Sequence, residues 1–232
     1  MKKRFTFLIF LFLPIISFGQ VQMGFKGGYI YYWYTYPNDG NYEYVYDYSH
    51  NAFSVSVSLK QTSLQIFNLG YELEYTNRSF GVNSTMNGLG AGGNVNFNYT
   101  LGNLYLRIEP QFSFGTNVKF YFFPGVYFGT LLHSSLNGTK YSWTLGHTTG
   151  TIDSINGTAK GYYPAFEFGL LIGLGIEFPL YKNLDCVFQH NFKMNILPIA
   201  SSWGSSKIKM LNLNFEFGLV YLFRKINAKS SE

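Results

Sequence analysis

The sequence FEFGLLIGLGIE, residues 166–177, decides the fold. Every even position from Phe166 to Ile176 is apolar, and every odd position except Leu171 is glycine or glutamate. This period of two predicts a β-strand with one apolar face and one polar face. The stretch is longer than the usual strand of about five or six residues. It suits a strand that crosses a membrane at a tilt, which needs about 9–11 residues.

Similar stretches recur along the chain. Four more alternate regularly, at 53–60, 68–75, 104–112 and 213–223. Three less regular ones complete a set of eight, at 22–36, 118–130 and 184–197. In the regular stretches one face is apolar, while the other carries polar, charged or glycine residues. A soluble lipocalin-like barrel with the apolar face inside would show the same pattern, so alternation alone does not choose between these two folds.

The connectors between the stretches alternate between short and long. Three are short, at 61–63, 115–117 and 181–183, and four are long, near 37–50, 80–98, 131–162 and 198–206. Outer-membrane barrels have short periplasmic turns and longer extracellular loops. We therefore predict an all-β, eight-stranded antiparallel transmembrane up-and-down β-barrel in the outer membrane of a Gram-negative bacterium. An even number of strands places both termini in the periplasm.

The composition excludes several other classes of protein. Charged residues make up 12% of the chain and aromatic residues 20%, whereas soluble domains have about 25% charged residues and disordered chains few aromatics. After residue 20 no run of about 18 apolar residues occurs, which argues against membrane-spanning helices. The single cysteine rules out a disulfide framework. No metal-ligand spacing or phosphate-binding loop occurs, so we expect no cofactor and no metal.

The first 19 residues have the features of a signal peptide. Lys2, Lys3 and Arg4 precede an apolar run, and the small residues Ser17 and Gly19 fit a cleavage site that leaves residue 20 as the mature terminus. Without these three cations the formal net charge falls from +5 to +2, so the basic balance does not indicate nucleic-acid binding. An uncleaved N-terminal anchor is the alternative.

The expected organisation has three parts. A signal peptide occupies 1–19, an outer-membrane β-barrel domain 20–224 and a short periplasmic tail 225–232. The last strand of the barrel carries a candidate assembly signal, made of Glu216, Gly218, Tyr221 and Phe223. Their polar, glycine and aromatic pattern is the one that the barrel assembly machinery reads, so we expect that machinery as a partner during insertion. An ordinary amphipathic strand can also match this pattern.

Four segments of the chain are similar to a known family. They are MGFKGG at 23–28, LYLRIEP at 104–110, the segment 120–129 with its Pro-Gly pair, and FGLLIGLG at 168–175. With these segments the chain resembles, over residues 22–223, the Bacteroidetes outer-membrane β-barrel family, also called porin family or PorT-like proteins. The resemblance implies the fold and the cell compartment, not a pore. A PorT-like relationship would also allow a role as an accessory subunit of a secretion or uptake machine.

The polar faces of the strands predict a charged interior. If they line the lumen, we expect an ion-pair network of eight residues there: Glu72, Glu74, Arg107, Glu109, Glu167, Glu177, Lys193 and Glu216. An eight-stranded barrel is only wide enough for its own side chains. Buried carboxylates must be paired, and the planar guanidinium of Arg107 is the predicted hub because it can serve two of them. We expect a plugged lumen, with an ion- or proton-conducting core as the alternative.

The first long loop contains a candidate surface for binding. Four tyrosines alternate with other residues there: Tyr42, Tyr44, Tyr46 and Tyr48. Asp-Gly at 39–40 favours a hairpin turn, so we expect the first two strands to project as a ribbon, with a bulge near 50–51. Tyrosines suit stacking on sugar rings or contact with a protein. The expected partners are outer-membrane lipid and lipopolysaccharide, an extracellular glycan or protein ligand, and no nucleic acid.

Support for an enzyme is weak. Lipid A deacylases use serine, histidine and a carboxylate, and His133 with Ser135 has a slight likeness to their His-x-Ser motif. Leu136 stands where that family has asparagine. We therefore expect no catalytic residues and no enzyme. The leading hypothesis is a structural or surface-binding, adhesive protein that acts through its extracellular loops. An accessory subunit of a secretion or uptake machine is the first alternative, and a lipid A-modifying enzyme is the second.

Overall fold

The computed structural model describes residues 20–35, 43–45, 52–62, 66–88, 91–144, 151–158, 164–196, 199–200 and 207–223. The strands are β1 (Gln20–Thr35), β2 (Glu43–Val45), β3 (Ala52–Thr62), β4 (Phe67–Gly88), β5 (Ala91–Phe114), β6 (Lys119–Thr144), β7 (Thr151–Gly157), β8 (Phe166–Tyr181), β9 (Leu184–Asn195), β10 (Ile199–Ala200) and β11 (Lys207–Phe223). Within these ranges, no helix has the length and apolar character needed to cross a membrane.

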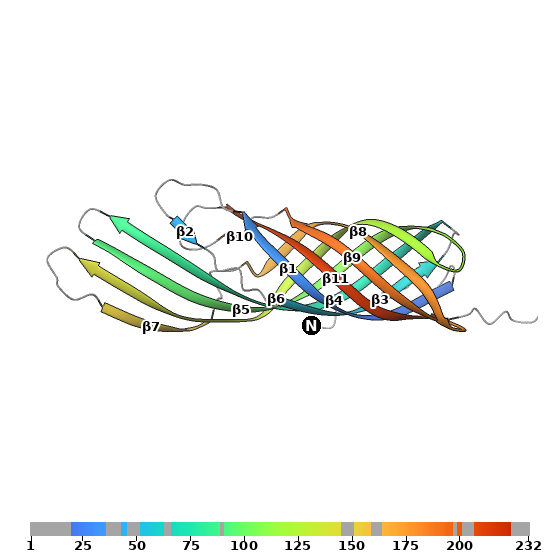
Figure 1. The fold of residues 1–232 in the computed structure, drawn as a ribbon, viewed down its shortest axis with the longest axis horizontal. Coiled ribbons are helices and arrows are strands. Elements are labelled where there is room, and N and C mark those ends of the chain that lie inside the picture. Colours follow the sequence, from blue (N-terminus) through green and yellow to red (C-terminus); the bar gives the residue numbers. More distant parts are fainter. Residues whose placement is uncertain are drawn as a thin grey trace, which may run out of the picture.

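Eight of the strands form one closed barrel (Figure 1). Neighbours follow the order β1, β3, β4, β5, β6, β8, β9 and β11, and β11 pairs with β1 to close the ring. Every pairing in the ring is antiparallel. The short strands β2, β7 and β10 pair with β4, β6 and β11. The predicted eight-stranded antiparallel barrel is confirmed.

The barrel has a polar interior and an apolar exterior. On β8, Glu167 and Glu177 are each 2% exposed, whereas Phe166 is 71% and Leu174 59% exposed. The apolar side chains therefore face outward, as the hydrocarbon of a membrane requires. A soluble lipocalin-like barrel would have the two faces exchanged, so this arrangement excludes that alternative.

Glycines on the inward face of β8 make room for aromatic rings of β6. The pairs are Tyr127 over Gly169, Phe123 over Gly173 and Tyr121 over Gly175. A methyl group on any of these glycines would lie 2.2–2.5 Å from an atom of its ring, which is far inside van der Waals contact. The rings fill the lumen from one wall, and the alternation of glycine with apolar residues in β8 follows from that packing.

Strands β4, β5 and β6 continue far beyond one end of the barrel (Figure 1). The β4–β5 pairing runs on to Gly88 and Ala91, and β6 reaches Thr144 and adds β7 at its edge. We call residues 79–88, 91–102, 131–144 and 151–157 the projecting sheet. The prediction of long loops near 80–98 and 131–162 is therefore wrong over most of their length, because most of these residues lie on paired strands.

A β-bulge marks the base of the projecting sheet. Gly102 pairs with His133 while Asn103 pairs with Leu131, so Leu132 is an extra residue on β6. The insertion exchanges the two faces of β6. Tyr127 points inward on the membrane side of the bulge, whereas Leu136 points inward beyond it.

The first hairpin differs from its prediction. The β1–β3 pairing reaches Ile30 and Ala52, and β2 pairs with residues 83–85 of β4 and not with β1. Because β4 extends beyond the end of β3, its edge is open there, and β2 occupies part of that edge. The bulge predicted near 50–51 lies outside the described residues.

Candidate functional site

The lumen is organised around one arginine. The guanidinium of Arg107 is fully buried, and its Nη1 lies 2.9 Å from Glu72 Oε1, 2.8 Å from Glu216 Oε1 and 3.2 Å from Glu74 Oε2. Its Nε donates a 2.7 Å hydrogen bond to Glu109 Oε1. One side chain of β5 thus contacts four carboxylates from β4, β5 and β11. Planar guanidinium groups suit such multiple pairing, since their donors are spread over a rigid fork.

Two lysines add positive charge around Arg107. Lys26 Nζ pairs with Glu72, donates to Gln189 Oε1 at 3.0 Å and lies 3.7 Å from Glu216 Oε2. Lys193 Nζ pairs with Glu74. Lys26 is not among the predicted lumen residues, because the stretch 22–36 does not alternate regularly enough to show which of its residues face inward. Glycine at positions 24 and 28 was the available signal, since these glycines share the inward face with residue 26.

Further ion pairs lie on either side of this hub. Toward the projecting sheet, Arg78 Nη2 lies 2.5 Å from Glu167 Oε1, and the Tyr105 hydroxyl donates to Glu167 Oε2 at 2.7 Å. Toward the short turns, Lys60 Nζ lies 2.7 Å from Glu177 Oε2. The eight residues predicted to share the lumen are all buried there. Arg78 was missed because it stands beside the segment assigned to a loop.

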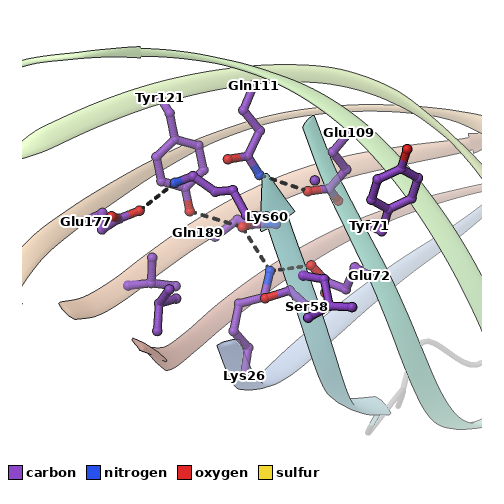
Figure 2. Close-up of a pocket in the computed structure, with 14 residues that line it drawn as sticks. Lys26, Ser58, Lys60, Tyr71, Glu72, Glu109, Gln111, Tyr121, Glu177 and Gln189 are labelled. Carbon is purple, nitrogen blue, oxygen red and sulfur yellow. Dashed lines mark hydrogen bonds and ion pairs between the residues drawn. The ribbon is translucent and has the colours of Figure 1, made fainter. Parts of the chain in front are cut away.

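A small cavity lies near the short-turn end of the lumen (Figure 2). It has a volume of about 20 Å³ and is lined by polar side chains that include Lys26, Lys60, Glu72 and Gln111. This volume suits about one water molecule. The buried Oε1 atom of Gln111 has no hydrogen-bond partner among the described residues, so a water there would satisfy it.

Three glutamates of the hub have the composition of a cation site. Carboxylate oxygens of Glu72, Glu74 and Glu216 lie within 4.8 Å of one another, and hard divalent cations prefer such ligands. Arg107 and Lys26 or Lys193 already contact these oxygens, as described above. The protein's own cations therefore occupy the positions that a metal ion would take.

Above the charged residues lies an apolar cluster. It is formed by Ile30, Tyr32, Ala52, Phe80, Phe97, Tyr99, Leu101 and Leu136. The rings of Phe80 and Tyr99 stack with centroids 5.0 Å apart. The guanidinium of Arg78 lies 5.4 Å from the centroid of the Tyr32 ring, so a cation–π contact joins the cluster to the charged layer beneath it. The inner face of the projecting sheet thus packs over the mouth of the lumen.

The other predicted site residues are placed as follows. Tyr42, Tyr46 and Tyr48 lie outside the described residues, and the backbone of Tyr44 pairs with Ser84. Of the candidate assembly signal, Glu216 faces the lumen, whereas Tyr221 and Phe223 face outward with their rings 5.0 Å apart, edge to face. Gly218 packs against Lys26, where a Cβ atom would lie 2.5 Å from Lys26 Cγ.

The histidine considered for catalysis lies on the outside of the barrel wall. The His133 ring stacks on Tyr75 with centroids 6.5 Å apart. Within the described part of the chain, no hydrogen bond links His133 to Ser135 or to a carboxylate. A nucleophile needs such a bond to its base, so the geometry does not assemble a triad. His190 of β9 also faces outward, and its ring stacks on Phe215 with centroids 4.7 Å apart.

The fold is similar to several solved outer-membrane proteins. They include Neisserial surface protein A, NspA (11% identity, 88% of this chain and 97% of that one, TM-score 0.48), and the attachment invasion locus protein Ail of Yersinia pestis (13%, 87% and 98%, TM-score 0.38). The outer membrane protease OmpT of Escherichia coli is similar too (7%, 89% and 98%, TM-score 0.39).

A match in sequence is more specific than these likenesses. No curated protein is significantly similar to the chain. However, the family model described as "Outer membrane protein beta-barrel domain" matches residues 17–224, which is nearly the whole chain. Together with the closed barrel and its apolar exterior, this match shows that the chain belongs to the outer membrane protein β-barrel domain family, whose place is the outer membrane of Gram-negative bacteria.

Proposed function

We propose that the protein is a structural or adhesive surface protein, in which a barrel with a plugged lumen carries a binding sheet on the extracellular side. The observation that carries this proposal is the projecting sheet. The barrel pairings of β3 and β8 end at Ala52 and Phe166, whereas β4, β5 and β6 continue for many residues beyond them. Spanning the membrane does not require this extension, so it indicates a task outside the membrane.

The short turns support the orientation. The turns at 115–118 and 182–183 lie at the end of the barrel opposite the projecting sheet (Figure 1). Outer-membrane barrels keep short turns in the periplasm and long segments outside. The proposal therefore places both termini in the periplasm and the projecting sheet at the cell surface. The finer similarity to the PorT-like proteins of Bacteroidetes is part of this proposal.

Cell adherence tests the adhesive role. In a non-adherent host, expression of the unchanged protein is expected to increase retention of cells on a protein-coated surface. A variant in which an Asn-Gly turn replaces residues 80–99 joins Ser79 to Thr100, which are direct cross-strand partners. Its cells should adhere no better than cells with an empty vector. A retained shift in gel mobility between unboiled and boiled samples controls for folding, and equal adherence of both proteins would contradict the proposal.

An accessory role in a secretion or uptake machine is a second candidate, which the edge of β7 favours. Of the strands that the structure describes, β6 is the one that pairs with β7, and residues 151–157 are exposed except for Ile155, which is half-buried. An open strand edge can accept a strand of a partner protein. A stoichiometric partner that co-purifies with the unchanged protein but not with Ser154→Pro would favour this candidate over adhesion.

A further inference from the structure

The two faces of the projecting sheet have opposite character. Its inner face carries the apolar cluster, and the charged side chains described in the sheet, Lys140 and Asp153, share that face. Its outer face carries mainly uncharged polar groups and glycine: Ser79, Gly81, Asn96, Asn98, Thr100, Ser135, Asn137, Thr139, Ser154 and Asn156. In the next row Tyr141 and Ile152 also face outward. The described side chains of the outer face are therefore uncharged, although a solvent-exposed surface would tolerate charged residues.

The polar groups of the outer face form rows across the strands. Asn98, Asn137 and Asn156 are direct cross-strand neighbours on β5, β6 and β7. In the next row Asn96, Thr139 and Ser154 are neighbours in the same way. Adjacent strands lie about 4.8 Å apart, and alternate residues on one strand about 6.8 Å apart. The face is thus a regular array of amides and hydroxyls.

Most of these groups are available to a ligand. The hydroxyls of Ser79 and Thr100 lie 3.1 Å apart and satisfy each other. The remaining side chains of the array make no hydrogen bond with any other described side chain. Asn96, Asn98, Asn137 and Asn156 are exposed, so a ligand outside the sheet can reach their side chains.

The outer face continues the membrane-facing surface of the barrel. Below the array lies an outward row of Asn77, Gly102 and His133. Below that row Tyr75, Leu104 and Phe128 belong to the apolar exterior. The stack of His133 on Tyr75 lies at the boundary between the two regions. A molecule that lies against the array therefore stands directly above the lipid that surrounds the barrel.

We propose that this outer face binds the uncharged sugars of the lipopolysaccharide around the barrel. The inference rests on the proposed function for its orientation, because the sheet must lie outside the cell. Sugar hydroxyls both donate and accept hydrogen bonds, as the amides and hydroxyls of the array do. Phosphate or sulfate groups would call for arginine or lysine, and a protein partner for apolar or aromatic anchors. Neither set occurs in the two rows of the array, and the apolar side chains Tyr141 and Ile152 lie in the row beyond them.

The membrane setting favours lipopolysaccharide over a free glycan. A single exposed hydrogen bond contributes little net free energy, so an array of this kind binds a dissolved sugar chain weakly. Lipopolysaccharide is held in the same leaflet as the barrel, and this confinement gives its sugars a high effective concentration at the array. Many weak contacts are then sufficient.

Selective retention of lipids tests the inference. The purified protein is placed in nanodiscs with equal amounts of lipopolysaccharide and of lipid A, and native mass spectrometry counts the molecules of each that remain bound. We expect the unchanged protein to retain lipopolysaccharide at least about threefold more than lipid A, a difference well under one tenfold step in affinity. In Asn96→Asp/Asn137→Asp the ratio should fall to about one, because amide donors are lost and a carboxylate resists desolvation.

Two further variants and one competitor make the result decisive. Asn98→Ala/Asn137→Ala adds no charge and should lower the ratio as well. Asn117→Asp/Asn183→Asp makes the same charge change at the short turns and should leave the ratio unchanged. Equal retention of the two lipids by the unchanged protein would overturn the inference. The same would follow if both array variants kept the ratio of lipopolysaccharide to lipid A that the unchanged protein shows. Displacement of lipopolysaccharide by dextran, a dissolved uncharged glucan, would overturn the assignment to membrane-held sugars.

This experiment and the adherence assay fail separately. If the lipid ratio is one while adherence still depends on residues 80–99, the sugar inference falls and the adhesive function stands. If the ratio depends on the array while adherence does not depend on the sheet, the inference stands. The projecting sheet then binds lipopolysaccharide of its own membrane and not an external surface, and the adhesive function is rejected.

Discussion

At the scale of single residues, Arg107 decides whether the lumen can be filled with carboxylates. Four glutamates contact its guanidinium, and all four are buried. Burying an unpaired charge costs several kcal/mol of free energy. Removing one partner of a buried ion pair therefore destabilises the fold, because the other charge stays buried without a partner. The stability of the hub therefore depends on one side chain far more than on any single glutamate.

Arg107→Met tests this dependence. The substitution keeps the volume but leaves Glu109 without a cation and weakens the pairing of the other three, so we expect a loss of about 3–5 kcal/mol in the free energy of unfolding. Urea titration of the protein in lipid vesicles measures it. Lys140→Met, which removes a cation of the projecting sheet, is the matched control and should cost less than about 1 kcal/mol. An unchanged urea midpoint for Arg107→Met would refute the role of the hub.

Gly175 illustrates the second kind of residue that fills the lumen. A Cβ atom at this position would lie 2.2 Å from Cζ of Tyr121, and its three nearest atoms all belong to that side chain. We expect Gly175→Ala to destabilise the barrel by about 1–3 kcal/mol through overpacking. In Gly175→Ala/Tyr121→Leu the loss should be smaller than the sum of the two single losses.

Gly157→Ala is the control for this pair, because a Cβ atom there meets no atom within 4 Å. It should leave the urea midpoint unchanged. Strict additivity of the losses at Gly175 and Tyr121 would show that the ring does not require the glycine.

At the scale of elements, parity was the most reliable signal in the sequence. For the stretch 166–177, both the strand and its inward face were predicted correctly, since the glutamates and glycines all stand at odd positions. Residues 80–98 were assigned to a loop because they lack regular alternation, and Asn, Ser, Thr and Gly are frequent there. Those residue types are typical of loops when single chains are considered. They form strands here because β4, β5 and β6 satisfy one another's backbone groups, which no single segment reveals.

The bulge at Leu132 could not be predicted for the same reason. A one-residue insertion shows itself only against a partner strand, in this case at Gly102 and Asn103 of β5. Its consequence for the element is large. Without the extra residue, Leu136 would face outward and Asn137 would point at the apolar cluster.

Deletion of Leu132 tests this consequence. Because the deletion exchanges the two faces of β6 beyond the bulge, it should loosen the projecting sheet. Trypsin should then cut after Lys140 at least about tenfold faster. A tenfold change in rate corresponds to a loss of about 1.4 kcal/mol in local stability. The barrel should keep its shift in gel mobility on boiling, since the hub lies below the bulge. Leu132→Ala keeps the residue count and should resist trypsin as the unchanged protein does. Equal rates of cleavage for the deletion and for Leu132→Ala would contradict the account.

At the scale of the whole molecule, the barrel is filled in layers. The short-turn end holds Lys60 and Glu177, the middle holds the hub of Arg107, and the end toward the projecting sheet holds Arg78 under the apolar cluster. Between these layers, aromatic rings of β6 occupy one wall of the lumen. A cavity of about 20 Å³ lies beside them near the short-turn end.

This filling predicts that the protein does not conduct ions. The purified barrel should give no single-channel current above background in planar lipid bilayers. The reason is that a passing ion would have to separate buried ion pairs and displace packed rings. A porin of known conductance in the same bilayers serves as the positive control. Resolved opening steps from the unchanged protein would instead support the conducting core that the sequence left open.

The position of Glu216 on the last strand of the barrel has a consequence for biogenesis. Arg107 and Lys26 belong to strands made earlier, and Glu216 reaches them only when β11 pairs with β1. A slip of one residue in that final pairing would turn Glu216 toward lipid and bring an adjacent phenylalanine against the guanidinium. A barrel closed in a shifted register therefore loses the ion pairs that stabilise the correct register. The buried ion pairs of Glu216 therefore select the correct register of the β1–β11 pairing when the barrel closes.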